Sequence, residues 1–288
     1  MAYLIRKSLG QLSEVGIKAL GLLGALALAP FEWDDLVQVL DLNMSDSMKI
    51  LSELTGYSFL VLIDDKCQLC HALVHGYADK EMTTTPEDIN RLSQHFSNKI
   101  KDLETDFIKI DDLRPHAFMI QEKAFSCESY EEVINIAFVL VDYLSMRGYN
   151  QDYTRVNELG LKAAEITEDE GKIDILLGNV AGGHANLGNI PKSLECYEKA
   201  LDLSKRNDNK YGQMLHSNNI GLTYNNIGKI PQAIQYLETS VKLAIELEEY
   251  PLLCGSLCNL GYCYKITGNF PKAIKYFEQS LVLSLIHI

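Results

Sequence analysis

The feature that most constrains this chain is a unit that recurs every 40 residues toward the C-terminus. The copies begin at Gly188, Gly228 and Gly268 and read GNIPKSLECYEKAL, GKIPQAIQYLETSV and GNFPKAIKYFEQSL. A fixed period of this length is typical of stacked arrays, in which a helical hairpin buries its apolar face only against its neighbours. The sequence therefore predicts an α-solenoid.

Aligning the copies places a small residue seven positions before each glycine and a proline three positions after it. The small residue lets paired helices approach, and the glycine supplies the backbone angle that ends the first helix. The proline suits the start of the second helix. This pattern resembles a tetratricopeptide repeat of the extended-helix type, since the ordinary unit has about 34 residues. Gly148 lies one period earlier, so residues 148–166 are predicted to form the second helix of a degenerate first repeat.

The N-terminal part shows a different pattern. Apolar residues at helical spacing predict helices over residues 4–29, 33–42, 48–55 and 72–82. A β-rich run, a turn and a second run predict a hairpin over residues 57–71. Three helices, a hairpin and a helix form a winged-helix pattern, which we assign to residues 1–82.

Three runs in this part carry a family resemblance: ALGLLGALALAPF, YSFLVLI and CHALVHGYA. They resemble the winged-helix domain of signal-transduction ATPases with numerous domains, which are NB-ARC-like proteins. The last run matches the family's closing motif at Cys70, His71, Leu73, Val74, Tyr77 and Ala78. The resemblance implies that His71 reaches a bound nucleotide diphosphate and holds the off state. Ala72 stands where plant relatives have an aspartate, which puts any aspartate-dependent part of that contact in doubt.

The middle of the chain is predicted to be helical. Helices are expected over residues 87–103, 113–126 and 129–147. We therefore divide the chain into a winged helix (1–82), a helical connector (83–128) and an array of about four tetratricopeptide repeats (129–288). The last repeat is expected to be cut short, because residues 283–288 resemble the translation of a sequencing adapter and a polar capping helix is missing.

Asparagines gather on the first helices of the repeats, which line the concave groove of tetratricopeptide arrays. An amide both donates to and accepts from a peptide main chain, so a ladder of amides suits the capture of a protein or peptide partner. The alternative is that Asn179, Asn219 and Asn259 tie neighbouring helices together. The predicted groove residues are Asn179, Asn186, Asn218, Asn219, Asn225, Asn226, Asn259, Tyr262 and Lys265.

Composition excludes several functions. The formal charge is −13, and residues 1–85 hold six Lys/Arg against eleven Asp/Glu, so a nucleic-acid partner is not expected. The apolar run before Pro30 is too short for a membrane span. The sequence lacks a G-x-x-x-x-G-K-[ST] motif, so ADP or ATP is expected only in a longer parent protein, which could also oligomerise. We predict that this chain has no cofactor and is not an enzyme.

Cysteines and histidines provide one rival interpretation. The run Cys67-Gln-Leu-Cys70-His71 matches the signature for covalent haem attachment, and the N-terminus imitates an export signal. An exported haem protein is therefore an alternative. We favour cysteines that pack as small hydrophobic residues in the cytoplasm, and no metal site. The scattered histidines, assigned to the core or the surface, are His95, His116, His184 and His216.

The leading functional interpretation is the sensor region of a signalling ATPase. In this interpretation the repeat groove binds a partner or ligand, and the winged helix relays the event to a nucleotide switch outside this chain. Such a relay requires two states with different affinities for the trigger. The alternative is a stand-alone scaffold of repeats, or the sensor half of a transcription regulator.

Overall fold

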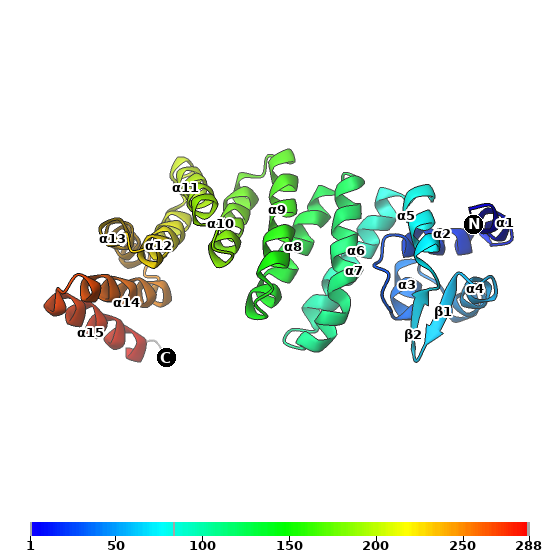
Figure 1. Ribbon diagram of the computed structural model, residues 1–288, viewed down its shortest axis with the longest axis horizontal. Helices are drawn as coiled ribbons and strands as arrows, with labels where there is room; N and C mark the ends of the chain where they lie inside the picture. Colours follow the sequence, from blue (N-terminus) through cyan, green and yellow to red (C-terminus); the bar gives the residue numbers. More distant parts are fainter. Residues whose placement is uncertain (1, 83, 287–288) are drawn as a thin grey trace. The chain divides into compact units, whose positions relative to one another are not determined.

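The computed structural model describes residues 2–82 and 84–286. These residues form fifteen α-helices and one two-stranded antiparallel sheet (Figure 1). The predicted all-α class with a small β-hairpin is confirmed. The chain divides into two compact units, Met1–Gly148 and Tyr149–Ile288. None of the described helices combines the length and the apolar character that crossing a membrane requires.

The first unit begins with five helices and a hairpin. The helices are α1 (Ala2–Leu9), α2 (Glu14–Leu23), α3 (Trp33–Val39), α4 (Met44–Gly56) and α5 (Ala72–Glu81). Strands β1 (Leu60–Ile63) and β2 (Lys66–Leu69) pair between α4 and α5. An isolated bridge joins Phe31 to Cys67, so the segment after α2 lies beside β2. The elements predicted within residues 1–82 are present, and their assignment to a winged-helix domain stays a prediction.

The core of this part is built from leucines, because α2 carries apolar residues on nearly every side. The fully buried leucines of α2, α3 and α4 are Leu20, Leu22, Leu23, Leu36 and Leu54. Side chains fix where the helices begin, since Ser13 accepts a hydrogen bond from the N–H of Gly16 and Asn43 accepts one from Asp46. These bonds satisfy backbone donors that the first helical turn leaves open.

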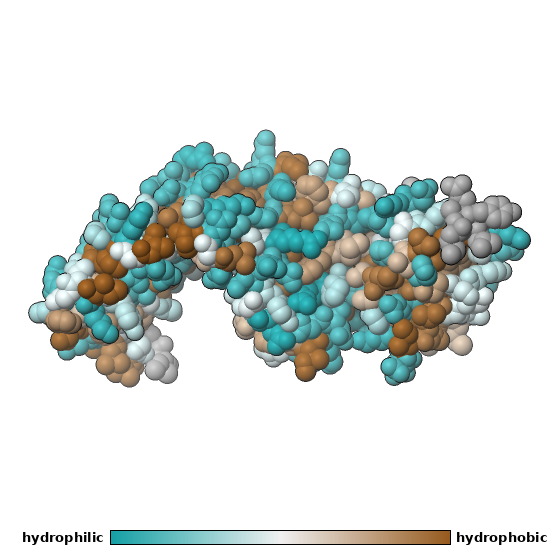
Figure 2. Space-filling view, viewed as in Figure 1, coloured by the Kyte–Doolittle hydropathy of each residue, from teal (hydrophilic) through white to brown (hydrophobic). Residues whose placement is uncertain are grey.

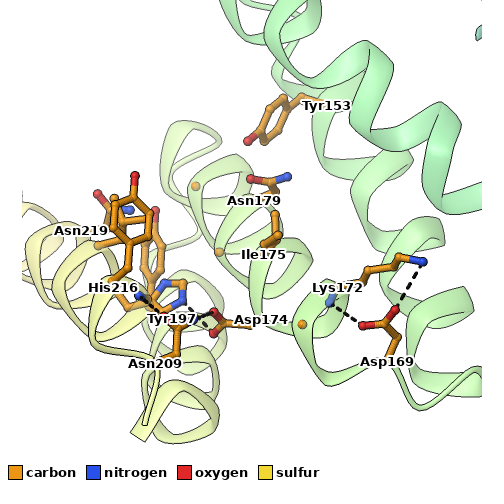
Figure 3. Close-up of a pocket in the computed structure, with 16 residues that line it drawn as sticks. Tyr153, Asp169, Lys172, Asp174, Ile175, Asn179, Tyr197, Asn209, His216 and Asn219 are labelled. Atoms are coloured by element: carbon orange, nitrogen blue, oxygen red, sulfur yellow. Dashed lines mark hydrogen bonds and ion pairs between the residues drawn. The ribbon is translucent and has the colours of Figure 1, made fainter. Parts of the chain in front are cut away.

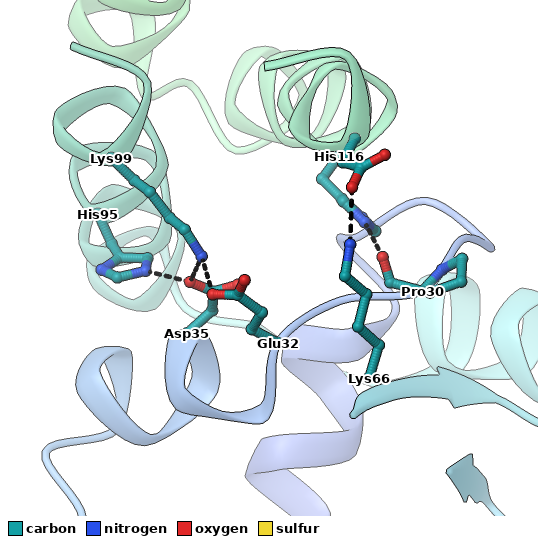
Figure 4. A network of polar contacts seen from close by, with 8 residues as sticks. Pro30, Glu32, Asp35, Lys66, His95, Lys99 and His116 are labelled. Atoms are coloured by element: carbon teal, nitrogen blue, oxygen red, sulfur yellow. Dashed lines mark hydrogen bonds and ion pairs between the residues drawn. The ribbon is translucent and has the colours of Figure 1, made fainter. Parts of the chain in front are cut away.

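Three further helices complete the first unit: α6 (Pro86–Asp102), α7 (Phe107–Ser126) and α8 (Tyr130–Met146). A polar network joins α6 to α3 (Figure 4). Asp35, only 3% exposed, accepts hydrogen bonds from His95 Nε2 at 2.8 Å and Lys99 Nζ at 2.6 Å. Burial raises the pKa of Asp35, but these hydrogen bonds outweigh burial and hold the pKa below its usual value. The predicted winged helix and connector are therefore held together by a buried ionic contact.

The second unit consists of helices that follow one another every 20 residues. They are α9 (Asn150–Ile166), α10 (Glu170–Asn186), α11 (Ile190–Arg206), α12 (Lys210–Asn226), α13 (Ile230–Glu246), α14 (Tyr250–Ile266) and α15 (Phe270–Ile286). Each has 17 residues, and three residues link it to the next. Consecutive helices pack against each other in chain order (Figure 1), as the predicted solenoid requires.

The links between these helices share one backbone geometry. The predicted glycines have positive φ angles, for example 77° at Gly188, and the N–H groups after the helix return to its last carbonyls. Gly188 N–H donates to Ala185 O, and Asn189 N–H donates to His184 O, which is a Schellman motif. The alternate links use an acidic residue at the same place, with positive φ. These residues are Glu168, Asp208 and Glu248.

Small residues allow each pair of helices to pack closely, as the sequence predicts. A Cβ added to Gly221 on α12 would lie 2.7 Å from Cγ of Leu237 on α13. A Cβ added to Gly261 on α14 would lie 2.6 Å from Cε1 of Phe277 on α15. Both distances are too short for carbon atoms, so a side chain at either place would require Leu237 or Phe277 to shift.

One prediction about the repeats is wrong. The last repeat was expected to be cut short, yet α15 has 17 residues, as many as every other helix of the second unit. The second helix of this repeat thus reaches its full length within the described residues. Of the adapter-like residues 283–288, those at 287 and 288 lie outside the described part of the chain.

Exposed hydrophobic side chains gather on the C-terminal helices. Brown, hydrophobic patches cover part of the visible face there (Figure 2). The more exposed of these side chains are Ile245, Ile266, Phe270, Ile274, Leu281 and Leu285. In the middle of the array, by contrast, a cluster of apolar residues is buried between α10, α11 and α12.

Candidate partner-binding groove

A cavity of about 620 Å³ lies between α10 and α12 in the second unit. Side chains from α9, α11 and the two preceding loops also reach it, and Figure 3 shows how they surround it. The side chains that give the cavity its character are Tyr153, Ile175, Asn179, Tyr197, His216 and Asn219. Aromatic rings and amides thus share the same walls, a combination that suits a ligand with both apolar and hydrogen-bonding groups.

Two glycines leave one wall of this cavity without side chains. Gly178 and Gly182 lie four residues apart on α10 and therefore share a face of the helix. A Cβ added to Gly178 would lie 3.0 Å from His216 Cε1, and one added to Gly182 would lie 3.3 Å from the Tyr197 hydroxyl. The open space in front of His216 thus depends on the missing side chains.

His216 is held in place by a buried hydrogen-bond network. Its Nε2 lies 3.0 Å from Asp174 Oδ1, and the residue is 5% exposed. The same carboxylate accepts from Ser204 Oγ at 2.7 Å and from Asn209 Nδ2 at 3.3 Å. The Ser204 hydroxyl thus faces the carboxylate and is not aligned with the imidazole. The network orients the ring and leaves Nδ1 buried without a hydrogen-bond partner in the described residues.

The predicted asparagines separate into two groups. Asn179 and Asn219 both line the cavity, and Asn179 Nδ2 donates to Asn157 Oδ1 at 3.0 Å. Asn218 is instead buried, with an exposure of 7%. Its Oδ1 accepts from Ser256 Oγ at 3.0 Å and from Asn259 Nδ2 at 3.5 Å, which ties α12 to α14. Asn179 and Asn259 thus make contacts between helices, as the second interpretation expects, and the capture of a partner by the asparagines stays a prediction.

The other predicted groove residues lie outside the cavity. Asn186 is exposed, with its Nδ2 3.4 Å from Asn150 Oδ1, and Asn225 accepts a long hydrogen bond from a cysteine thiol on α14. Asn226 is exposed at the end of α12. On α14, Tyr262 is 55% exposed and the Lys265 Nζ lies 5.5 Å from the centre of its ring. None of these residues lines the cavity.

Comparison with known proteins agrees with this geometry. Residues 173–243 and 211–283 each match the family model of the tetratricopeptide repeat. The C-terminal hairpins are tetratricopeptide repeats. No curated protein sequence matches the chain.

Three solved structures are similar in fold. BtubC from P. vanneervenii has a TM-score of 0.55 at 19% identity, over 75% of this chain and 84% of its own. The apo form of RapI has a TM-score of 0.59 at 18% identity, over 67% and 70%. A Signal Transduction ATPase with Numerous Domains with a tetratricopeptide repeat sensor, from Pyrococcus horikoshii, has 15% identity over 96% and 58%. Its TM-score of 0.44 is too low to support an argument, and the other two show the fold alone.

His71 belongs to the first unit, and the cavity belongs to the second. It is exposed and caps α5, because its Nδ1 accepts the Leu73 N–H at 3.0 Å. Cys67 is 1% exposed in β2, and burial raises the pKa of its thiol to about 11. The thiol of Cys70 points to the Ser58 carbonyl. These surroundings agree with cysteines that pack, and Cys67 is not presented for haem attachment.

The most specific part of the tetratricopeptide cavity was not predicted from the sequence. His216 was assigned to the core or surface, and neither Asp174 nor Gly178 was singled out. Asp174 and His216 are 42 residues apart, so they occupy different places in consecutive repeats. The sequence offered one signal. Asp174 and His216 each differ from the residues at the same place in the other copies of the repeat. That signal does not show that the two side chains meet.

Proposed function

We propose that the tetratricopeptide array binds an extended segment of a protein or peptide partner along α10, α12 and α14. The cavity of about 620 Å³ carries this proposal, because its size falls within the roughly 300–1,000 Å³ typical of ligand sites. Asn179 and Asn219 stand in its walls at the same register of consecutive repeats. Amides spaced in this way suit hydrogen bonds to successive peptide units.

The charges around the cavity favour a segment without strong charge. Asp169 pairs with Lys172 at 3.3 Å, and Asp174 pairs with His216. The Lys172 ammonium group offsets the charge of Asp169, and the oxygens of Asp174 already accept hydrogen bonds from His216, Ser204 and Asn209, so neither carboxylate offers an open contact to a basic ligand. The aromatic rings of Tyr153 and Tyr197 offer apolar contact area instead.

A display experiment tests this proposal. A phage library of linear heptapeptides is selected on the whole chain, and the selected peptides are mapped by hydrogen–deuterium exchange. We expect slower exchange in α10 and α12 when peptide is bound. Peptides that slow exchange only in the first unit, or a library that yields no binder, would contradict the proposal.

The same proposal extends to signalling. We infer that the chain is the sensor region of a signal-transduction ATPase, in which the winged helix relays partner binding to a nucleotide switch. The motif around His71 supports this role, and His71 is exposed at the first turn of α5, where a nucleotide could reach it. By itself the chain is expected to lack ATPase activity.

Titration with ADP tests the relay in a longer chain that carries the nucleotide-binding domain. His71→Ala should weaken ADP binding. His71→Asn is the matched variant, because asparagine keeps the helix cap but removes the imidazole. Weaker binding in both variants supports a nucleotide contact. Unchanged affinity in both variants would favour the alternative, a tetratricopeptide scaffold without a relay.

A further inference from the structure

His216 presents an unused hydrogen-bond acceptor in the cavity. Its Nε2 faces the Asp174 carboxylate, which only accepts, so the ring proton sits on Nε2. The neutral imidazole then has a lone pair at Nδ1. This atom is buried and has no partner in the described part of the chain. Buried polar atoms are nearly always paired, and leaving one unpaired costs about 1–3 kcal/mol.

We propose that His216 Nδ1 anchors the bound partner segment by accepting a hydrogen bond from an uncharged amide or hydroxyl group. This inference rests on the proposed partner binding and names the contact that gives the site its selectivity. Asp174 keeps its negative charge, but its oxygens already accept three hydrogen bonds, from His216, Ser204 and Asn209. The donor is expected to be uncharged because Nδ1 is buried, and bringing a charged group to a buried site costs more than bringing an amide or hydroxyl group.

The glycines of α10 support the same inference independently. A glycine in the middle of a helix costs about 0.5–1 kcal/mol relative to alanine, so Gly178 and Gly182 weaken α10. A Cβ at Gly178 would lie 3.5 Å from His216 Nδ1 and 3.0 Å from Cε1. A methyl group there would occupy the space from which a donor approaches Nδ1. The glycine thus leaves space beside the buried Nδ1.

The test uses Gly178→Ala in the whole chain, with heptapeptides selected on the wild-type protein. This change removes no hydrogen-bonding group of the His216 network, and the imidazole has to move by a few tenths of an ångström to admit the methyl group. We expect binding at least about tenfold weaker, which corresponds to about 1.4 kcal/mol. Gly76→Ala is the matched control, because Gly76 is a glycine inside α5, outside the proposed binding face, with no atom near the added methyl group. It should bind peptide like the wild type.

Two further measurements identify the contact. An alanine scan of the peptide should find one residue that carries an amide or hydroxyl group and contributes to affinity for the wild-type protein. Replacing that residue should not change the affinity for Gly178→Ala. The nitrogen NMR signal of His216 Nδ1 should show an unprotonated atom that shifts on binding. His184→Gln is a second control, since His184 also contacts a carboxylate, Glu158 at 3.1 Å, but does not line the cavity.

The outcomes separate this inference from the proposed function. If peptides slow exchange in α10 and α12 but bind Gly178→Ala as tightly as the wild type, the anchor is wrong and partner binding stands. A protonated Nδ1 in the free protein, or an unchanged signal on binding, also overturns the anchor. If no peptide binds the array, both proposals fail.

Discussion

At the scale of single residues, the left-handed backbone of the link glycines can be tested directly. Gly188 has φ of 77° and no atom within 4 Å of an added Cβ, so only backbone strain opposes a side chain there. Gly188→Ala should lower the free energy of unfolding by about 1–2 kcal/mol. Urea unfolding followed by circular dichroism measures the change. Gly255→Ala should act in the opposite direction, and a loss of similar size in both variants would contradict the backbone argument.

A second residue-scale prediction concerns the thiols. The thiolate is the reactive form, and burial raises the pKa of Cys67 to about 11. Cys258 is exposed on α14. Iodoacetamide at pH 8 should therefore modify Cys258 first, and Cys67 only after the protein is unfolded. Mass spectrometry of digested samples follows both sites over time. Equal rates for the two thiols in the folded protein would refute the burial of Cys67.

The same scale shows what the sequence predicts well. Gly188 and Pro191 were predicted correctly because the constraint on each is local: one needs a left-handed angle, and the other needs no N–H. The direction of the asparagine side chains was harder to predict. Asn218 and Asn219 are neighbours in the sequence, yet one is buried between helices and the other faces the cavity. A period locates the position of a residue in a repeat, but packing decides which way its side chain turns.

At the scale of elements, the contact between α3 and α6 should depend on pH. The folded pKa of Asp35 lies below its unfolded value of 3.8. The carboxylate therefore adds stability above about pH 4, and this stability is lost as the pH falls through the folded pKa. Asp35→Asn should lower the free energy of unfolding by about 2 kcal/mol at pH 7, and the difference from the wild type should shrink toward pH 3.

Fluorescence of Trp33 can follow this transition, because it is the single tryptophan and lies on α3 beside Asp35. Its Nε1 donates to Ser47 Oγ at 2.9 Å in the folded state, so unfolding changes its surroundings. A difference between wild type and Asp35→Asn that stays constant from pH 7 to pH 3 would show that the ionised carboxylate does not stabilise the unit.

Helix boundaries were predicted less well than helix positions. The helix expected over residues 113–126 begins at Phe107, so Pro115 lies inside α7. A proline is favoured in the first turn of a helix, and Pro115 departs from that preference because it lies inside α7. The observed start is fixed by Asp106, whose side chain accepts the Lys109 N–H, and by the burial of Ile110. Tertiary packing of this first segment cannot be seen in a single sequence.

At the scale of the whole molecule, stability should vary along the array. Repeat proteins gain stability from contacts between neighbours. Helix α13 packs between α12 and α14, whereas α15 packs against α14. Each is the second helix of its hairpin and has 17 residues, so the two helices do not differ in length. Amide hydrogens should therefore exchange faster in α15 than in α13. Mass spectrometry of the free chain measures both helices together, and equal protection would contradict a stability set by neighbours.

The alternation of the links has a consequence for how such a gene can change. Glycine follows α10, α12 and α14, and an acidic residue with the same backbone angle follows α9, α11 and α13. Losing or duplicating 20 residues would place two helices of one kind side by side, and the bare surface of Gly221 would no longer meet Leu237. Only a change of 40 codons keeps every neighbour matched. Evolutionary changes in the length of the binding face are therefore expected to add or remove whole helical hairpins.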